Sequence, residues 1–190
     1  MTETDTPTPL IFVTGNKNKV LEVKAILSTT PLEVLDINLP EIQGSVEEIT
    51  REKCRAAAER IGGPVLVEDS ALEMKALGGL PGAYVKAFVD TIGNEGLNKI
   101  LAAFDDKSAD AVCTFGYSPG LGHEPLLFQG RLQGRIVPAR GNSSFGWEPI
   151  FEVEGETLAE MEVGKKNGLS HRFKALVKFR EWFQGAKEAD

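Results

Sequence analysis

The sequence predicts a single mixed α/β domain, and three features of the 190-residue chain carry that prediction. An apolar run over 10–13 is followed at once by a polar turn and an amphipathic helix. Two long runs, 109–118 and 126–137, flank a Pro119-Gly120 turn and predict a β-hairpin. Helical and extended segments alternate elsewhere without a repeat, which favours a mixed sheet over a purely parallel one.

The elements before the hairpin follow from local signals. An extended stretch is expected from Leu32 to Leu39. Ser45 and Glu48 form a capping box, which predicts a helix that ends before the pair Gly62-Gly63. The apolar segment 64–67 then predicts a short buried strand.

The rest of the chain is organised by glycine, proline and helix caps. The Gly- and Pro-rich segment 78–82 predicts a loop, and helices are expected over 84–91 and 95–104. The segment 138–149 is too polar and irregular for a regular element. The last helix is expected to begin at Ser170 and to run to about Gln184.

Composition excludes several classes of protein. The net charge of −7 argues against a nucleic-acid-binding protein, and no apolar stretch approaches the roughly 20 residues of a membrane span. The Thr- and Pro-rich segment 1–9 predicts a short disordered tail, which leaves 10–190 as the one domain. Cys54 and Cys113 have small or apolar neighbours, so we expect buried free thiols in a reducing cytoplasm.

The turn after the first strand has the chemistry of an anion-binding site. Thr14, Gly15 and Asn16 are followed by Lys17 and Lys19 at the start of a helix. Unpaired amides and the positive end of the helix dipole both favour phosphate there. Because the spacing matches neither the P-loop nor the dinucleotide glycine signature, a plain strand–turn–helix junction remains the alternative.

Acidic residues follow the predicted strand at 64–67. Glu68 and Asp69 are expected at its carboxyl end, where ligands gather in open α/β sheets, and Glu41 is a second candidate ligand. Mg²⁺ favours a few carboxylates together with substrate phosphates. The alternative is that these acids are only solvated at a strand end.

Cationic and aromatic side chains supply further candidate sites. Lys53, Lys86 and Lys166 are each either phosphate ligands or solvated surface charges. His171-Arg172 opens the last helix, whose amides favour an anion or a carbonyl oxygen. In the segment 138–149, Trp147 either faces a flat base or anchors the loop in the core.

Five ordered segments together resemble one family. They are Thr14-Gly-Asn-Lys-Asn-Lys19, Pro64-Val-Leu-Val-Glu-Asp-Ser70, Leu77-Gly-Gly-Leu-Pro-Gly82, Phe145-Gly-Trp147 and Ser170-His-Arg172. In this order and spacing the chain resembles the Ham1-type nucleoside triphosphate pyrophosphatases, also known as inosine triphosphate pyrophosphatases, especially their eukaryotic branch. The resemblance extends from Leu10 to Phe183.

The resemblance implies a fold, a reaction and a cellular setting. The fold would be an elongated α/β domain of two lobes around a central nucleotide-binding cleft, usually in a homodimer. The reaction would be hydrolysis of ITP, dITP and XTP to the monophosphate and pyrophosphate, with Mg²⁺ or with Mn²⁺ as a substitute. Such an enzyme cleanses the nucleotide pool of the cytoplasm or nucleus, without a nucleic-acid or membrane partner.

Carried over residue by residue, the resemblance also implies roles at the phosphate end. Triphosphate contacts fall on Thr14, Gly15, Asn16, Lys17, Asn18 and Lys19. Glu41 and Asp69 match the metal-binding acids, with Glu68 and Ser70 alongside, and Asp69 is expected to activate the attacking water. The catalytic group is therefore expected to be Asp69, Glu41 and Lys19, while Lys53, Lys86 and Lys166 neutralise phosphate charge.

At the base end, Phe145 is expected to stack on the purine. The remaining base-pocket positions are Gly146, Trp147, Glu148, His171 and Arg172. A donor such as Arg172 satisfies a six-keto oxygen but meets a six-amino group unfavourably, which separates inosine from adenosine. Glu148 departs from the aspartate usual in the family, and we expect this to alter base selectivity or KM more than phosphate chemistry.

Two other functions are compatible with parts of this pattern. One is a Maf-like pyrophosphatase acting on modified pyrimidine nucleotides, against which the Phe145-Gly-Trp147 and Ser170-His-Arg172 segments argue. The other is a nucleotide-binding module without catalysis, against which the intact acids and Lys19 argue. A panel of nucleotide substrates distinguishes the three.

Overall fold

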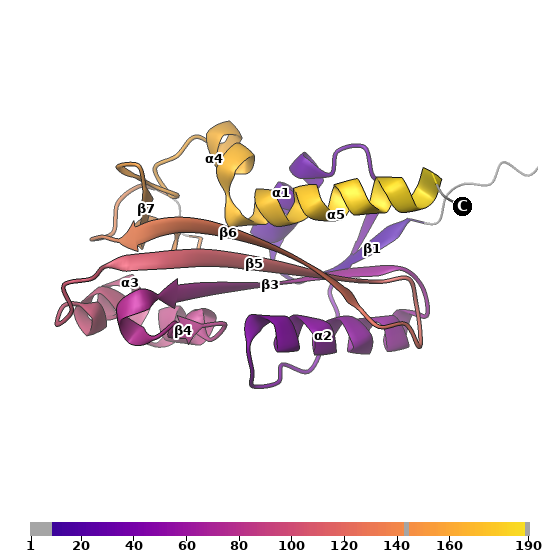
Figure 1. Ribbon diagram of the computed structural model, residues 1–190, viewed down its shortest axis with the longest axis horizontal. Coiled ribbons are helices and arrows are strands. Elements are labelled where there is room, and N and C mark those ends of the chain that lie inside the picture. The colour runs from indigo at the N-terminus through magenta and orange to yellow at the C-terminus, as the bar shows by residue number, and fades with distance from the viewer. Residues whose placement is uncertain (1–8, 143–144, 189–190) are drawn as a thin grey trace, which may run out of the picture.

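The computed structural model describes residues 9–142 and 145–188, so the predicted tail lies outside the described residues except for Pro9 (Figure 1). Its strands are β1 (Leu10–Val13), β2 (Leu32–Leu35), β3 (Val65–Met74), β4 (Pro81–Gly82), β5 (Ser108–Ser118), β6 (Leu126–Ile136), β7 (Phe151–Val153) and β8 (Glu156–Thr157). Its helices are α1 (Lys17–Ile26), α2 (Val46–Ile61), α3 (Val85–Leu101), α4 (Val163–Leu169) and α5 (His171–Glu188), with 3-10 turns η1 (Lys75–Leu77) and η2 (Glu148–Ile150).

All eight strands belong to one mixed sheet, which confirms the predicted fold class. The strand order is β2-β1-β3-β5-β6-β7-β8, and β4 pairs with β3. β1 runs parallel to β2 and β3, whereas the other pairings are antiparallel. The long strands β3, β5 and β6 extend along the longest axis of the molecule (Figure 1).

The predicted end of the third strand is wrong. β3 continues past Val67 to Met74, because it stays in register with β5 from Val65 opposite Ser118 to Met74 opposite Ala109. Glu68, Asp69 and Ser70 therefore lie in the middle of a strand and not at its carboxyl end. Long-range pairing with β5 overrides the local polarity that suggested a strand end.

The hydrophobic core is divided between the two ends of the sheet. At one end α1 and α5 pack on one face, where Phe12, Phe115 and Phe179 are buried, and α2 packs on the other (Figure 1). At the other end Leu101 of α3 and Ile150 of η2 belong to a separate cluster. This division gives the two lobes that the resemblance implied.

Other boundaries differ locally from expectation. The second extended stretch ends at Leu35, and the two helices expected over 84–104 form one element, α3, interrupted at Gly93 with φ 68°. α4 was not predicted, because seven residues without apolar periodicity give little signal. α5 begins after Ser170, whose Oγ accepts from the Phe173 amide at 3.1 Å, and it extends beyond Gln184 to Glu188.

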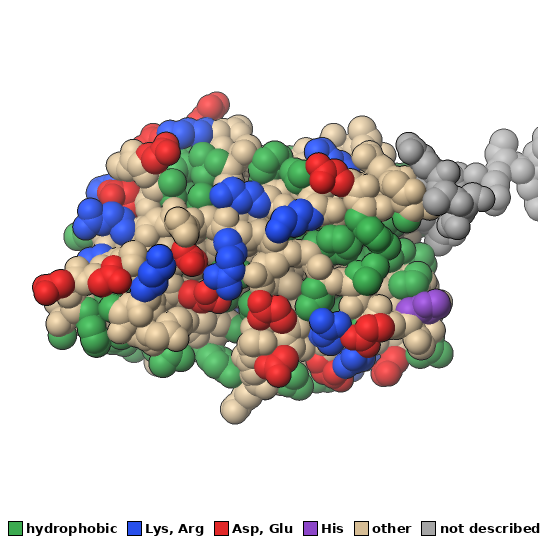
Figure 2. Space-filling view, viewed as in Figure 1, with side chains coloured by type: hydrophobic (Ala, Val, Ile, Leu, Met, Phe, Trp, Pro, Cys, Tyr) green, Lys and Arg blue, Asp and Glu red, His purple; other side chains and the backbone are tan. Residues whose placement is uncertain are grey.

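The surface charges, the helices and the cysteines can be compared with what composition predicted about nucleic-acid binding, membrane spans and free thiols. On the face drawn in Figure 2, lysine and arginine side chains of the described residues are interspersed with acidic ones. In the described part of the chain, no helix combines the length and apolarity that a bilayer crossing requires. Cys54 and Cys113 are buried free thiols, and burial raises the pKa of Cys54 to about 12.

Candidate active site

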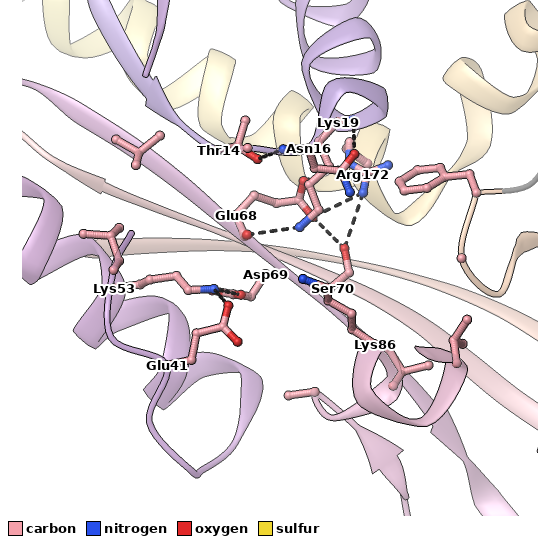
Figure 3. A pocket seen from close by; sticks show the side chains of 18 of the residues that line it. Thr14, Asn16, Lys19, Glu41, Lys53, Glu68, Asp69, Ser70, Lys86 and Arg172 are labelled. Carbon is pink, nitrogen blue, oxygen red and sulfur yellow. Dashed lines mark hydrogen bonds and ion pairs between the residues drawn. The ribbon is translucent and has the colours of Figure 1, made fainter. Parts of the chain in front are cut away.

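A cavity of about 680 Å³ lies along one edge of β3 where that edge has no strand partner. β1 pairs with β3 only as far as Leu66, and β4 pairs with it again at Leu72. Successive side chains of a strand point to opposite faces. Because the cavity wraps around this open edge, it receives both Glu68 from one face and Asp69 from the other (Figure 3).

The predicted anion-binding turn lies at this cavity. Asn16 caps α1, because its Oδ1 accepts from the amides of Asn18 and Lys19 at 3.0 and 3.1 Å. The Thr14 Oγ1 accepts from the Asn16 amide at 3.1 Å. A Cβ on Gly15 would lie 2.7 Å from the Asp36 carboxylate, so a larger residue here would displace the Asp36 side chain.

Lys19 connects the turn to β3. Its Nζ donates to the backbone oxygen of Glu68 at 3.2 Å and lies 3.2 Å from the Glu68 Oε1 (Figure 3). The first turn of α1 is thereby held against the open edge of the strand. An ammonium group fixed beside the positive end of a helix dipole is suited to binding a phosphate oxygen.

Asp69 lies on the opposite face with Lys53 and Glu41. The Lys53 Nζ is 2.5 Å from Asp69 Oδ1 and 3.0 Å from Glu41 Oε1 (Figure 3). Burial disfavours the charged amine, yet Asp69 and Glu41 raise the pKa of Lys53. The hydrogen bond from Lys53 in turn lowers the pKa of Glu41. Both groups are therefore charged at neutral pH.

The two acids fit a divalent cation. Asp69 Oδ2 is buried and has no hydrogen-bond partner in the described part of the chain, while the Glu41 side chain is 68% exposed. Within residues 9–142 and 145–188 there is no cluster of three or more His, Cys, Asp or Glu side chains that could hold a metal. Two carboxylates match Mg²⁺, which takes its other ligands from water and substrate phosphates.

Arg172 is held on the Glu68 side by a buried network of charges. It forms a two-point contact with Glu68, from Nε at 3.0 Å and from Nη2 at 3.2 Å, and a further contact with Glu22. The Nη2 group also lies 3.4 Å from the Ser70 Oγ. Although burial disfavours the ion, Arg172 and Lys19 keep the pKa of Glu68 well below its usual range. The pair is therefore ionised throughout the physiological range.

Lys166 extends this network toward the aromatic segment. Its Nζ lies 2.8 Å from both Glu22 and Glu148, and 5.8 Å from the centroid of the Phe145 ring. The Arg172 guanidinium lies 5.7 Å from the same ring. The Phe145 ring is thus placed beside two cations, at distances typical of cation–π contacts.

Trp147 and His171 form the wall next to this ring. Their ring centroids are 5.4 Å apart, and Trp147 also packs on Phe151 of the core. Trp147 therefore both lines the cavity and anchors the loop. Burial, together with nearby Arg172, lowers the pKa of His171 to about 3, so the imidazole is neutral at pH 7.

The neutral His171 makes stability depend on pH. Its pKa is about 3 in the folded chain against 6.5 ordinarily, so below pH 6.5 the unfolded chain binds the proton more readily. The free energy of unfolding should therefore fall as the pH drops from 6.5 to 5, with about 2 kcal/mol of that fall coming from His171. Urea unfolding at pH 7 and pH 5 should show this loss reduced in His171→Gln. An equal loss in both proteins would contradict it.

Most of the predicted site residues line the same cavity. They are Thr14, Gly15, Asn16, Lys19, Glu41, Lys53, Glu68, Asp69, Ser70, Lys86, Phe145, Gly146, Trp147, Glu148, His171 and Arg172. Lys17, Asn18 and Lys166 are not in that lining among the described residues, although Asn18 donates its amide to the Asn16 cap and Lys166 contacts Glu148. Several lining residues were not predicted, among them Asp36 at the turn, and neither was Glu22, which lies outside the lining and pairs with Arg172. Glu22 precedes the buried Val23 and lies one helical turn after Lys19. Its place on the same helix face as Lys19 was the sequence signal that could have identified it as a site residue.

Comparisons with known proteins give one consistent result. A model of the Ham1 family matches residues 10–182. The chain is 89% identical over 187 residues to the inosine triphosphate pyrophosphatase of Aspergillus oryzae, covering 97% of this chain and 98% of that protein. It is 58% identical to the inosine triphosphate pyrophosphatase of Ajellomyces capsulatus, covering 90% of this chain and 94% of that one.

Solved structures agree with the sequence comparisons. The Staphylococcus aureus Ham1 protein superposes with a TM-score of 0.80 at 28% identity, covering 93% of this chain and 99% of that one. A HAM1 protein from Coxiella burnetii gives a TM-score of 0.84 at 26% identity, covering 94% and 100%. The chain therefore belongs to the Ham1 family.

Proposed function

We propose that this protein hydrolyses ITP, dITP and XTP to the nucleoside monophosphate and pyrophosphate, and so cleanses the nucleotide pool. The observation that carries the proposal is the cavity at the open edge of β3. It brings together a charged group, formed by Asp69, Lys53 and the turn before α1, and an aromatic group, in which the Phe145 ring lies beside Arg172. A nucleoside triphosphate likewise has a charged end and an aromatic end.

The phosphate end of the substrate fits the turn and the three lysines around it. The positive end of the α1 dipole and the Lys19 ammonium would bind phosphate oxygens, and Lys53 and Lys86 would neutralise further charge. Catalysis of this kind depends mostly on positioning and on electrostatic stabilisation of the phosphate oxygens.

Asp69 and Glu41 would hold Mg²⁺, with Mn²⁺ as a substitute. When bound, the ion supplies Lewis-acid stabilisation of charge on phosphate oxygens. Asp69 would also remove a proton from the attacking water. The water oxygen then bonds to the α-phosphorus, the bond to the bridging oxygen breaks, and pyrophosphate leaves with that electron pair. Lys53 keeps the Asp69 carboxylate oriented throughout.

Arg172 would select the six-keto group of the base. A guanidinium has five N–H donors. Its four hydrogen bonds to described residues, to Glu68, Glu22 and Ser70, leave one N–H on Nη1 for a ligand. Adenine would place an amino group against this donor, which leaves a buried polar group unpaired.

Glu148 should tune the choice among six-keto bases. Its Oε1 is 2.8 Å from the Lys166 Nζ, and aspartate would withdraw the carboxylate by about one carbon–carbon bond length. Glu148→Asp is expected to change the relative KM values of ITP, XTP and GTP by about 2- to 10-fold, the range of one hydrogen bond, with the products unchanged. Steady-state kinetics with the three substrates would measure this. If Glu148→Asp and the wild-type protein had identical kinetics with all three substrates, the role of Glu148 in base selectivity would be contradicted.

The proposed reaction is tested by identifying its products. The protein is incubated with Mg²⁺ and ITP, XTP, GTP, ATP or dUTP, and pyrophosphate is resolved from orthophosphate. We expect rapid release of pyrophosphate from ITP and XTP, with ATP spared and with activity lost in EDTA. Preference for dUTP would favour the Maf-like alternative. Tight ITP binding without turnover would favour a non-catalytic module, and direct release of orthophosphate would contradict the mechanism.

The setting of the enzyme is also part of the proposal. We infer a homodimer of the cytoplasm, with the nucleus as an alternative, that acts on free nucleotides without nucleic-acid or membrane partners. The net charge of −7 supports the absence of a nucleic-acid partner, and the two free buried thiols support a reducing compartment; the homodimer rests on the family resemblance alone. Light scattering on the eluting protein would measure the oligomeric state, and a monomer at micromolar concentration would contradict it.

A further inference from the structure

The segment that carries Phe145 and Trp147 is attached to α3 by two asparagines. The Asn94 Nδ2 donates to the Gly146 backbone oxygen at 3.0 Å. One turn later, the Asn98 Nδ2 donates to the Val137 oxygen at 3.0 Å. These two contacts hold the loop both where it leaves β6 and where it enters the cavity.

The backbone of α3 is adapted to this attachment. Gly93 has φ 68° and ψ 178°, which interrupts the helix and starts a second helical segment at Asn94. The Asn98 Nδ2 also lies 3.2 Å from the Asn94 backbone oxygen, which fixes the start of that segment. The Asn94 Oδ1 is buried and has no hydrogen-bond partner in the described part of the chain. A buried, half-satisfied amide has a cost, which the contact from Nδ2 to Gly146 offsets in part.

The contact joins two segments that line the cavity. The first half of α3 contributes Lys86 and Val89 to the lining, and the loop contributes Gly146. Gly146 has φ 56° and stands between the two aromatic residues, so a contact to its carbonyl restrains the backbone next to both rings. A shift of this peptide would move the Phe145 ring relative to Arg172, which is 5.7 Å away.

We propose that Asn94 is a positioning residue for base recognition, acting through the Gly146 carbonyl on the Phe145 ring. The inference rests on the proposed function in that it assumes a purine at this ring. It predicts that Asn94 affects the base end of the ligand and leaves the phosphate end unaffected. A residue that only stabilises the fold would affect both ends alike.

The test compares two ligands that each report one end of the cavity. Calorimetry with inosine monophosphate reports the base end, and calorimetry with tripolyphosphate and Mg²⁺ reports the phosphate end. In Asn94→Ala the Kd of inosine monophosphate should rise about 2- to 10-fold, the range expected for one hydrogen bond, while that of tripolyphosphate stays unchanged. Asn94→Asp, which replaces the donor with an oxygen facing the carbonyl, should weaken inosine monophosphate at least as much. Lys99→Ala, an exposed position on the same helix, is the matched control and should change neither constant.

The outcomes separate this inference from the proposed reaction. An unchanged Kd for inosine monophosphate in both Asn94 variants, or an equal loss for both ligands, would overturn the role of Asn94. Because neither ligand is turned over, these constants are informative even if the wild-type protein fails to hydrolyse ITP. For ITP hydrolysis, Asn94→Ala should raise KM and leave kcat within about twofold of the wild-type value. The substitution changes substrate binding away from the bonds that react.

Discussion

Replacing Asp69 with asparagine is expected to lower kcat/KM for ITP by about a thousandfold, the scale of several kcal/mol of lost charge stabilisation. Asparagine keeps an acceptor for the Lys53 Nζ, now 2.5 Å from Asp69 Oδ1, so the fold should survive. It removes the negative charge at the buried Oδ2, which has no hydrogen-bond partner among the described residues. Pyrophosphate release at saturating Mg²⁺ measures the loss.

The matched control for this substitution is Glu73→Gln. Glu73 lies on the same strand and the same face as Asp69, pairs with Arg131, and is outside the cavity. Its removal should change kcat/KM by less than about twofold, since it touches no reacting group. If Asp69→Asn retained more than a tenth of the wild-type activity, Asp69 could not be both the metal ligand and the base.

Among the substitutions proposed here, Gly130→Ala is expected to lower the free energy of unfolding most. An added Cβ would lie 2.2 Å from the His171 oxygen and 2.4 Å from the Ala175 nitrogen, both backbone atoms of α5. Neither atom can move without displacing the helix, so overpacking should cost about 3 kcal/mol and lower Tm by roughly 6–12 °C. Because His171 and Arg172 open α5, affinity for ITP should fall together with stability.

Gly63→Ala provides the comparison for that substitution. Gly63 has no atom within 4 Å of an added Cβ, and its φ is not in the left-handed region. We expect a change of less than about 0.5 kcal/mol, as for most surface positions. Thermal unfolding of both variants, with ITP binding measured below Tm, tests whether the added Cβ at position 130 destabilises the protein. A Gly130→Ala protein as stable as wild type would show that α5 does not depend on this close approach.

Features set by neighbouring residues could be predicted from the sequence. The Asn16 cap of α1 depends on amides two and three residues away, and the Ser45–Glu48 capping box is equally local. The β5–β6 hairpin follows from two long runs around one turn. Such signals need no knowledge of the rest of the fold.

Features set by distant residues could not be predicted. Arg172 and Glu22 are 150 residues apart, and Arg172 and Glu68 are 104 residues apart, so neither buried pair leaves a local pattern. The open edge of β3 depends on where β1 and β4 stop pairing. Glu68 and Asp69 were expected in the site because the strand was predicted to end before them. The strand continues past both residues, yet both line the cavity.

A crystal structure of the Asp69→Asn protein with ITP and Mg²⁺ tests the central claim most directly, since it locates both ends of the substrate at the open edge of β3. We expect the hypoxanthine ring against Phe145, its six-keto oxygen within hydrogen-bond distance of Arg172, and the triphosphate at the turn before α1. A nucleotide bound in the reverse direction, or outside this cavity, would contradict the account.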